Sequence, residues 1–544
     1  MNIWKYIRED WKINSVVFFL DVIEATCTTL FGLASANILT EIVRPNLSAV
    51  FIWLSVLGVV SILWATEIFV HEKCLTIAMQ KMDTDIRNDI TAHLVDSGYT
   101  TFHKNNPSVY VSWLTNDINT INEYGFECLE LAITQAITIV MSITVIVSFH
   151  YSLIITILIL LVIMYFVPKL FSKVMNQTSL EVSKAAETAT KKISDFFAGF
   201  DDLLVMNLKN HIVEAINQSS SILKKAKGRQ ATAIGGMRGA SNLSSLLSQT
   251  VVIGQACFLY VIKAIPIGGI SAARYFAATI FANTTGMLAN FMEVKTTVPI
   301  FEKYVSFLLD DSFSEQQNSI KLQKLDKQQP QITFDSVDFG YNANTVLESC
   351  SFNFAAHKKY ILTGDSGTGK TTILDLIAMK SIPQKGRIFF NNINYSDIAA
   401  SEIYGQLMYI KQKPHIFNET LKFNITLGQP IPQKDIEHAI TVSGLESLIA
   451  QLPGGLSASI AENGEDLSGG QIQRIALARG LVQKKQIWLV DEATSSLDPA
   501  ARQDIEDRLM SLTGITLIMV SHNATKHLLH QADEVVQLVN GHVQ

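Results

Sequence analysis

Cysteine, proline and net positive charge are all scarce in this sequence. Its 544 residues include five cysteines and 12 prolines, and its formal net charge is −6. The cysteines are scattered and show no spacing typical of metal ligands or disulfides, so we interpret them as reduced packing residues. A negative net charge argues against a nucleic-acid surface. We therefore expect no nucleic acid among the partners of this protein.

Apolar residues, by contrast, are abundant. They make up 48% of the chain, and the mean hydropathy is +0.24, which is too apolar for an ordinary soluble enzyme. A helix needs roughly 20 apolar residues to cross about 30 Å of hydrocarbon. Apolar runs before residue 305 predict about six such spans, of which the fourth is short. These runs are residues 16–42, 49–70, 132–149, 153–167, 243–262 and 270–291. The sequence therefore predicts an integral, multi-pass protein of a lipid bilayer.

The basic residues predict the orientation of these spans. Lysine and arginine are concentrated in two long polar segments, between the second and third spans and between the fourth and fifth. The opposite loops are short and hold little beyond Arg44 and Lys263. The positive-inside rule places the long segments and both termini in the cytoplasm, most simply of the cell (plasma) membrane. Because these segments are rich in helix formers, we expect helices that run on from the membrane.

A change in pattern divides the chain. After Phe307 it becomes polar and rich in glutamine and lysine, which is typical of a linker. From Ile332 onward, short apolar strands alternate with amphipathic helices, the pattern of a parallel α/β domain. We predict a membrane α-helical domain over residues 1–308, a linker over 309–331 and an α/β P-loop ATPase domain over 332–544.

Four predicted strands of the second half end beside residues that could bind a ligand or take part in catalysis. The strand KKYILT leads into Gly364, QLMYIK into Gln412, QIWLV into Asp491, and TLIMVS into His522. In an open parallel sheet the ligand crevice lies at the carboxyl ends of the strands. We therefore expect these four groups to converge on one edge.

Residues 364–372, here called the glycine loop, read GDSGTGKTT and match the pattern G-x-x-x-x-G-K-[ST]. Glycines let successive backbone N–H groups wrap phosphates, and the helix that follows adds positive potential at its start. Lys370 is expected to reach the β- and γ-phosphates of ATP, and the Thr371 hydroxyl to coordinate Mg²⁺. The alternative is a glycine-rich turn with an exposed lysine. The predicted ATP-binding residues of the loop are Gly364, Asp365, Ser366, Gly367, Thr368, Gly369, Lys370, Thr371 and Thr372.

Two adjacent acidic residues follow the apolar run 487–490. A carboxylate at Asp491, the end of a predicted buried strand, can bind Mg²⁺ directly or through water. Glu492 can orient and polarise the attacking water. The alternative for this pair is an acidic helix cap. His522 could contact the γ-phosphate or be a packing or capping residue, and Tyr341 could stack on adenine or lie in the core.

A second glycine-rich stretch, LSGGQ, occupies residues 467–471. Ser468 and Gln471 have the spacing of a capping box, which predicts a helix starting there. A cap does not require the two glycines. They permit close approach to the backbone, so the start of this helix could also receive an anion.

In this order, GDSGTGKTT, Gln412, DLSGGQ, IWLVDE, SSLD and His522 resemble the nucleotide-binding domain of the ATP-binding cassette (ABC) family. The spans before them resemble the membrane domain of its exporter-type half-transporters, so the resemblance covers nearly the whole chain. It implies that two such domains pair head to tail, with each ATP between the glycine loop of one chain and the LSGGQ stretch of the other. The residues that would serve the partner's ATP are Ser468, Gly469, Gly470, Gln471 and Asp498.

The resemblance also assigns the remaining roles. Gln412 would complete the Mg²⁺ site and link it to the coupling helices. Residues 113–122 are similar to the stretch beside the first coupling helix, and residues 195–207 to the region of the second. The catalytic group would then be Glu492, His522 and Gln412, and the metal ligands Thr371, Gln412 and Asp491.

The leading hypothesis is an ATP-driven transporter that exports a small molecule, a lipid or a peptide by alternating access. It would act as a homodimer or with a different half-transporter chain. The alternatives are an importer of the same architecture, an ATP-gated sensor, and a soluble-type ABC ATPase, which the spans oppose. Asp21 and Glu24 share one face of the first span. We expect them either to line the translocation path or to be solvated or ion-paired near its cytoplasmic end.

Overall fold

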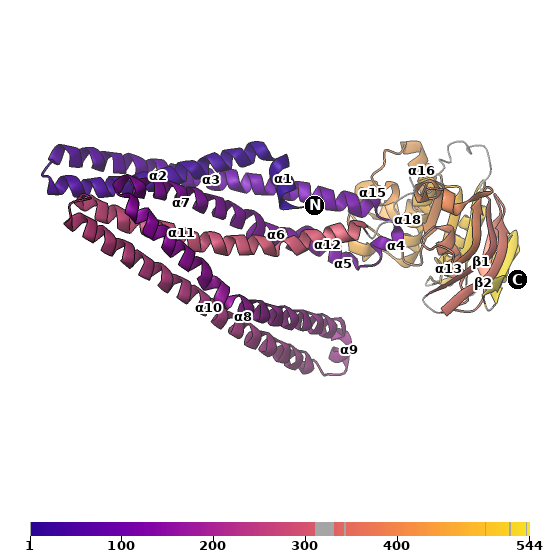
Figure 1. Cartoon of the computed structure of the whole chain (residues 1–544). Helices are drawn as coiled ribbons and strands as arrows, with labels where there is room; N and C mark the ends of the chain where they lie inside the picture. The colour runs from indigo at the N-terminus through magenta and orange to yellow at the C-terminus, as the bar shows by residue number, and fades with distance from the viewer. Residues whose placement is uncertain are drawn as a thin grey trace. The chain divides into compact units, whose positions relative to one another are not determined.

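The computed structural model describes residues 2–309, 331–341, 344–495, 497–521, 524–539 and 541–543 (Figure 1). It divides into two compact units. The first comprises Met1–Asp96 with Asn105–Leu309, and the second comprises Ser97–Lys104 with Asp310–Gln544. Most of the predicted linker, residues 310–330, lies outside the described residues, so the predicted domain boundaries stay predictions.

The first unit consists of long helices, as predicted. In chain order the main ones are α1 (Ile3–Glu9), α2 (Trp11–Val43), α3 (Leu47–Asp96), α7 (Glu127–Phe149), α8 (Tyr151–Ala198), α9 (Phe200–Val205), α10 (Asn210–Val261), α11 (Ile267–Thr296) and α12 (Val298–Leu309). The 50 residues of α3 span about 75 Å at 1.5 Å per residue, far more than a bilayer requires. The expected continuation of helices beyond the apolar spans is therefore present.

Among the described residues, five helical stretches are long and apolar enough to cross a membrane: α2, α3, Pro107–Phe149, α8 and α10. Large apolar side chains cover their outer faces, and Phe69, for example, is 74% exposed. The sixth predicted span falls on α11, which has the length but is not among these five. A Cβ on its Gly268 would lie 2.1 Å from the carbonyl oxygen of Ala36, so close helix approach requires a small residue there. The sixth span stays a prediction.

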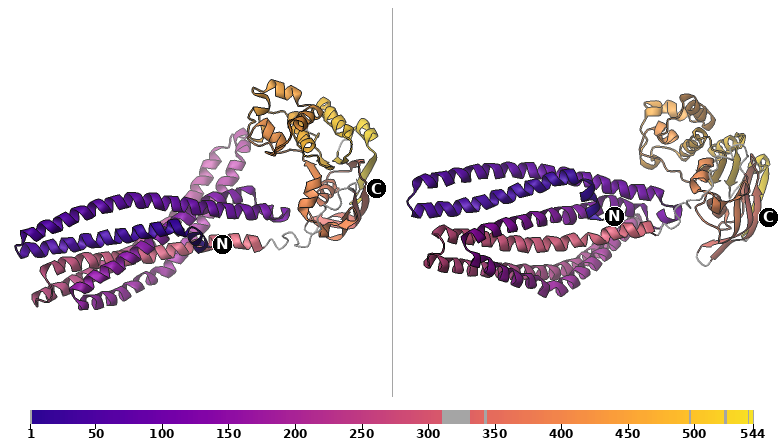
Figure 2. Two further views of the ribbon diagram at one scale, coloured as in Figure 1. Left: turned by 90° about the horizontal axis from the view of Figure 1, so that it is seen from above. Right: turned by 45° about the horizontal axis from the view of Figure 1, so that its top comes forward.

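The helices α8 and α10 pack along each other and form an arm that ends in α9. Figure 1 shows α9 at the tip of this arm, away from the other helices of the unit, and Figure 2 shows the arm from two further directions. No residue of α9 is buried. The side chains of the tip are therefore left largely uncovered by the described part of their own unit.

The second unit contains two sheets. The six-stranded sheet has the order β10-β9-β3-β8-β7-β6, in which only β10 pairs antiparallel. The other sheet is antiparallel with the order β2-β1-β4-β5. The strands are β1 (Ile332–Tyr341), β2 (Asn344–Phe354), β3 (Lys359–Thr363), β4 (Lys385–Phe390), β5 (Ile393–Asn394), β6 (Leu407–Ile410), β7 (Ile487–Asp491), β8 (Thr516–Val520), β9 (Glu534–Val539) and β10 (His542–Val543).

The four strands that the sequence analysis singled out are neighbours in one sheet. They are β3, β8, β7 and β6, and all are parallel. Their residues are mostly buried on both faces, as expected of a parallel sheet covered by helices. The four carboxyl ends therefore lie along one edge, as expected.

Helix α18 (Gly469–Val482) starts at the LSGGQ stretch and packs closely on β7. A Cβ on Gly480 would lie 2.4 Å from the Trp488 ring. Arg479, which is buried, anchors the same helix to α15 (Leu421–Thr426), because its guanidinium donates hydrogen bonds to the backbone and side-chain oxygens of Asn424. The helix that presents LSGGQ is thus fixed from two sides.

Candidate functional site

The glycine loop lies between β3 and α13 (Lys370–Ile377). Gly364, Gly367 and Gly369 have φ values of 144°, 82° and 103°, a region that favours glycine. At Gly364 a Cβ would also lie 2.5 Å from the carbonyl oxygen of Leu538. The loop therefore needs its glycines for its own conformation, and the backbone shape expected of a phosphate cradle is present.

Lys370 is folded into this loop and is only 4% exposed. Its Nζ donates hydrogen bonds to the carbonyl oxygens of Gly364 at 2.8 Å and Asp365 at 2.6 Å. Burial lowers the pKa of its ammonium group. The alternative interpretation, an exposed lysine on a turn, is therefore wrong.

Thr371 and Asp491 meet at the edge of the sheet. The Thr371 hydroxyl donates to Asp491 Oδ1 at 3.1 Å, and the Tyr409 hydroxyl donates to Asp491 Oδ2 at 3.3 Å. Burial raises the pKa of Asp491, against the opposing effect of the Thr371 hydrogen bond. Tyr409 also hydrogen-bonds to Asp375, and the Lys380 ammonium lies 3.4 Å from the centre of its ring. Sequence reasoning missed Tyr409 because it lies before the end of its strand.

Glu492 directly follows β7 and has a φ of 48°, which is uncommon for a residue with a side chain. Ser495 connects it to Gln412. The Ser495 hydroxyl donates to the Glu492 carbonyl oxygen at 3.0 Å, and Gln412 Nε2 donates to the Ser495 hydroxyl at 3.0 Å. Ser495 therefore links the predicted groups at the ends of β6 and β7. Sequence reasoning missed Ser495, and the only sequence signal for its role is its position three residues after Glu492.

The structure tests the alternatives for Tyr341 but not those for His522. Tyr341 ends β1, is 50% exposed and makes an edge contact with Phe339. This exposure excludes the core interpretation and leaves its ring available for stacking. His522 lies outside the residues that the structure describes, so its predicted role stays a prediction.

The LSGGQ stretch forms the expected capping box. The Gln471 backbone N–H donates to the Ser468 hydroxyl at 3.3 Å, and the Ser468 N–H donates to Gln471 Oε1 at 2.7 Å. Gly469 and Gly470 follow in the first turn. Asp498 caps α19 (Pro499–Ser511) by accepting from the N–H groups of Ala500 and Ala501. Among the described residues, no hydrogen bond joins LSGGQ to the glycine loop of the same chain.

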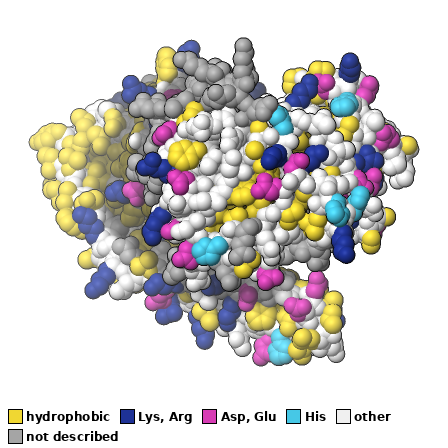
Figure 3. All heavy atoms as spheres, turned by 90° about the vertical axis from the view of Figure 1, so that its right-hand side faces the viewer, with side chains coloured by type: hydrophobic (Ala, Val, Ile, Leu, Met, Phe, Trp, Pro, Cys, Tyr) yellow, Lys and Arg dark blue, Asp and Glu magenta, His cyan; other side chains and the backbone are white. Residues whose placement is uncertain are grey.

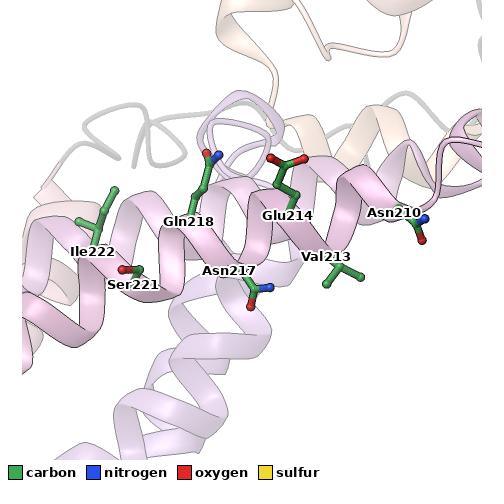
Figure 4. Close-up of a pocket in the computed structure, with 7 residues that line it drawn as sticks. All are labelled: Asn210, Val213, Glu214, Asn217, Gln218, Ser221 and Ile222. Carbon is green, nitrogen blue, oxygen red and sulfur yellow. The ribbon is translucent and has the colours of Figure 1, made fainter.

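A surface hollow also occurs away from this site. It has a volume of about 770 Å³ and is lined by residues of α10 alone, from Asn210 to Ile222. Figure 4 shows that the side chains of Glu214 and Gln218 point to one side of the helix and those of Val213 and Asn217 to the other. Side chains that come from one helix alone enclose no ligand, so the glycine loop remains the candidate site.

The donor atoms beside the loop fit Mg²⁺. A threonine hydroxyl and a carboxylate 3.1 Å apart are hard oxygen ligands, the kind that Mg²⁺ prefers. The Gln412 amide oxygen is a third candidate, since Ser495 occupies only the nitrogen of that amide.

Comparison with known proteins agrees with this geometry. Residues 347–495 match the family model described as ABC transporter, and residues 15–284 match the one described as ABC transporter transmembrane region. An ATP-dependent lipid A-core flippase of Photorhabdus laumondii is 22% identical over 100% of this chain and 95% of its own length. A mycobactin import ATP-binding/permease protein of Mycolicibacterium smegmatis is 33% identical over 40% of this chain and 38% of its own length.

The similarity extends to a solved structure of a bacterial Atm1-family ABC exporter with ATP bound. The TM-score is 0.84 at 18% identity, covering 98% of this chain and 95% of that one, so the likeness lies in the fold. The two family models cover the membrane unit and the ATPase unit in the order in which the fold presents them. The chain therefore belongs to the ABC transporter family, as an exporter-type half-transporter whose membrane domain is fused to an ATP-hydrolysing domain.

Proposed function

We propose that this ATP-driven transporter works as a pair of chains arranged head to tail. Each ATP would lie between the glycine loop of one chain and the residues Ser468, Gly469, Gly470 and Gln471 of the other, with Asp498 beside the junction. The observation that carries the proposal is the separation of these two loops. Each is completed by its own local contacts, and within the described part of one chain no hydrogen bond joins them.

Within each site the residues of one chain would divide the work. Lys370 and the glycine-loop N–H groups would bind the phosphates, and Tyr341 would stack on the adenine. Thr371, Asp491 and Gln412 would hold Mg²⁺, which supplies positive charge to the phosphates when bound. Glu492 would accept a proton from the attacking water. His522 would contact the γ-phosphate. The positive φ of Glu492 supports this role, because strained backbone is common at reactive groups.

The exposed tip of the α8–α10 arm supports the need for a partner chain. Val205 is 87% exposed, and Phe200, Leu204 and Met206 are also exposed. Apolar tips of polar helices mark interaction sites. The short helix α4 (Tyr99–Phe102), at the tip of the first polar segment, belongs instead to the ATPase unit of its own chain. We infer that α9 docks on the ATPase unit of the second chain.

The transported substrate is proposed to be a small molecule, a lipid or a peptide, exported by alternating access. The ATPase unit would face the cytoplasm, with the membrane unit in the cell membrane. Import is the second candidate, because one relative is named as a mycobactin import protein. Both candidates use the same nucleotide sites, so the direction depends on the membrane unit.

Native mass spectrometry of the full chain with Glu492→Gln tests the proposed assembly. The expected species after incubation with ATP and Mg²⁺ is a dimer that retains two ATP. Wild type, which turns over, should retain fewer. A purified wild-type chain that hydrolyses ATP as a monomer would overturn the proposal. ATPase stimulation by a panel of lipids, peptides and small molecules in proteoliposomes would then identify the substrate class, with Lys370→Ala as the inactive control.

A further inference from the structure

A group of charged residues lies inside the membrane unit, where α2, α3 and α7 meet. His71 Nε2 lies 2.9 Å from Asp21 Oδ1 and 3.3 Å from Glu130 Oε1. One ligand atom from each of these three residues lies within 4.8 Å of the other two. Asp21 is only 2% exposed, and the side chains of His71 and Glu130 are also mostly shielded. Three helices that are distant in sequence thus direct donor atoms to one point.

Two further carboxylates act on this group. Glu67, four residues before His71 on α3, and Glu24, three residues after Asp21 on α2, both interact electrostatically with Asp21, His71 and Glu130. Four carboxyl groups are therefore near enough to interact with one imidazole, and two of them contact it. Even a protonated His71 could balance only one of them, and separated charges are costly at membrane depth.

Glu67 provides the independent evidence for a ligand. It is 5% exposed, and neither of its carboxylate oxygens has a hydrogen-bond partner. A buried carboxylate with no partner costs several kcal/mol unless something neutralises it. Asp21 instead pairs with His71, and Glu130 accepts from the Thr134 hydroxyl at 3.0 Å. Glu67 therefore adds an unpartnered buried carboxylate near the three residues whose donor atoms lie together.

We propose that Asp21, His71 and Glu130 bind a divalent transition-metal cation, whose charge the nearby unpartnered carboxylate of Glu67 helps to balance. An imidazole with several carboxylates suits Zn²⁺ and its neighbours better than Mg²⁺ or Ca²⁺, which prefer oxygen ligands alone. Ligands at about 2.0–2.2 Å from such an ion lie about 3–4 Å from one another. The two distances from His71, 2.9 Å and 3.3 Å, are close to this range, and the donor atoms of Asp21 and Glu130 lie within 4.8 Å of each other. The inference is independent of the nucleotide site, which lies in the other unit.

Equilibrium dialysis of the nucleotide-free full chain against Zn²⁺, followed by metal analysis, tests the proposal. His71→Gln removes the nitrogen ligand, and His93→Gln is its matched control on the exposed face of the same helix. Wild type and His93→Gln should each bind one more Zn²⁺ per chain than His71→Gln, or bind it at least about 10-fold more tightly. Equal Zn²⁺ binding by all three proteins would overturn the proposal, and it would also expose adventitious binding to cysteines.

Glu67→Gln separates a metal site from a purely structural ion pair. Because Glu67 makes no hydrogen bond, the metal-free variant should unfold at the same temperature as wild type or higher. Zn²⁺ should raise the Tm of wild type and raise that of the variant less. Co²⁺ should give wild type a visible absorption band that His71→Gln lacks. If Zn²⁺ leaves the wild-type Tm unchanged, or if equal Mg²⁺ displaces it, the group is an ion pair or a different kind of site.

Discussion

Charged groups are arranged differently in the two units of this protein. In the ATPase unit, Thr371, Asp491, Gln412 and Glu492 lie where neighbouring parallel strands end, and each stands next to its motif in the sequence. In the membrane unit, Asp21, Glu67, His71 and Glu130 come from three long helices and belong to no motif. The surfaces differ in the same way. Large apolar side chains cover the spans, whereas the face seen in Figure 3 carries scattered charges of both signs over much of its area.

This difference reflects how each part of the function depends on the amino-acid sequence. A phosphate site depends on backbone geometry over a few consecutive residues, so its chemistry is local in the sequence. A site between packed helices depends on which faces meet, and this is a property of the whole bundle. We therefore expect substitutions in the ATPase unit to change the chemistry, and substitutions in the membrane unit or its arm to change coupling and cation binding.

The largest expected effect is on hydrolysis. Glu492→Gln should lower the ATPase rate by about 10²–10⁴-fold, the usual contribution of a general base, while ATP still binds. Steady-state ATPase assays and nucleotide binding on the purified chain measure the two quantities separately. Glu437→Gln, an exposed position on α16 (Gln433–Ser443), is the control and should remain active. A near-normal rate for Glu492→Gln would remove this residue from the chemistry.

The arm tip should have an intermediate effect of a different kind. Val205→Asp places a charge on the exposed apolar tip and should lower substrate-stimulated ATPase by about 10-fold, which corresponds to about 1.4 kcal/mol of lost docking. Basal nucleotide binding should not change, because α9 lies outside the ATPase unit. Asn217→Asp, exposed on the same arm, is the matched control. Equal stimulation of both variants would mean that α9 has no docking role.

The smallest expected effect is on the stability of the folded chain. Asp491→Asn should maintain or raise this stability even though it removes the ATPase activity. Burial raises the pKa of Asp491, so the folded chain binds its proton more tightly than the unfolded chain does. Below the unfolded pKa both states are protonated, and as pH rises through the raised folded pKa the charged carboxylate increasingly costs stability. Without nucleotide or Mg²⁺, Asp491→Asn should therefore unfold at an equal or higher temperature than wild type at pH 8, although its ATPase is lost.

Thermal unfolding at pH 5 and pH 8 checks this expectation. The advantage of Asp491→Asn should be smaller at the lower pH, where more of the wild-type carboxyl is protonated. Asp397→Asn, at an exposed position, should show no such change with pH. A variant that is less stable than wild type at pH 8 would show that the hydrogen bonds from Thr371 and Tyr409 outweigh the cost of the buried charge.

The sequence predicted the local structure around the candidate nucleotide site, because that structure is set over short stretches of the chain. The glycine loop, the strand ends and the capping box at Ser468 are each fixed within a few residues, and the structure has all three. Tyr409 and Arg479 could not be predicted, because their partners Asp491 and Asn424 lie 82 and 55 positions away. The sixth span was predicted from the sequence but is not among the described helices that are apolar enough to cross a membrane, and close packing requires a small residue at Gly268 in α11.

Asp21 shows how far sequence reasoning reached in the membrane unit. The sequence predicted that Asp21 lies on the first span and shares a face of that helix with Glu24. The alternative that Asp21 is ion-paired agrees with its contact to His71. The partners themselves could not, because His71 and Glu130 lie on other helices, 50 and 109 positions further along the chain.

The central claim is that each nucleotide site is shared between two chains. A mixture of full chains carrying Lys370→Ala with chains carrying Ser468→Arg tests it most directly. Each variant alone should be inactive, because both of its sites carry a lesion. In a mixed dimer one site combines both lesions and the other has an intact glycine loop and an intact LSGGQ, so ATPase activity should reappear. A mixture that forms mixed dimers and stays inactive, while wild type prepared alone hydrolyses ATP, would contradict the claim.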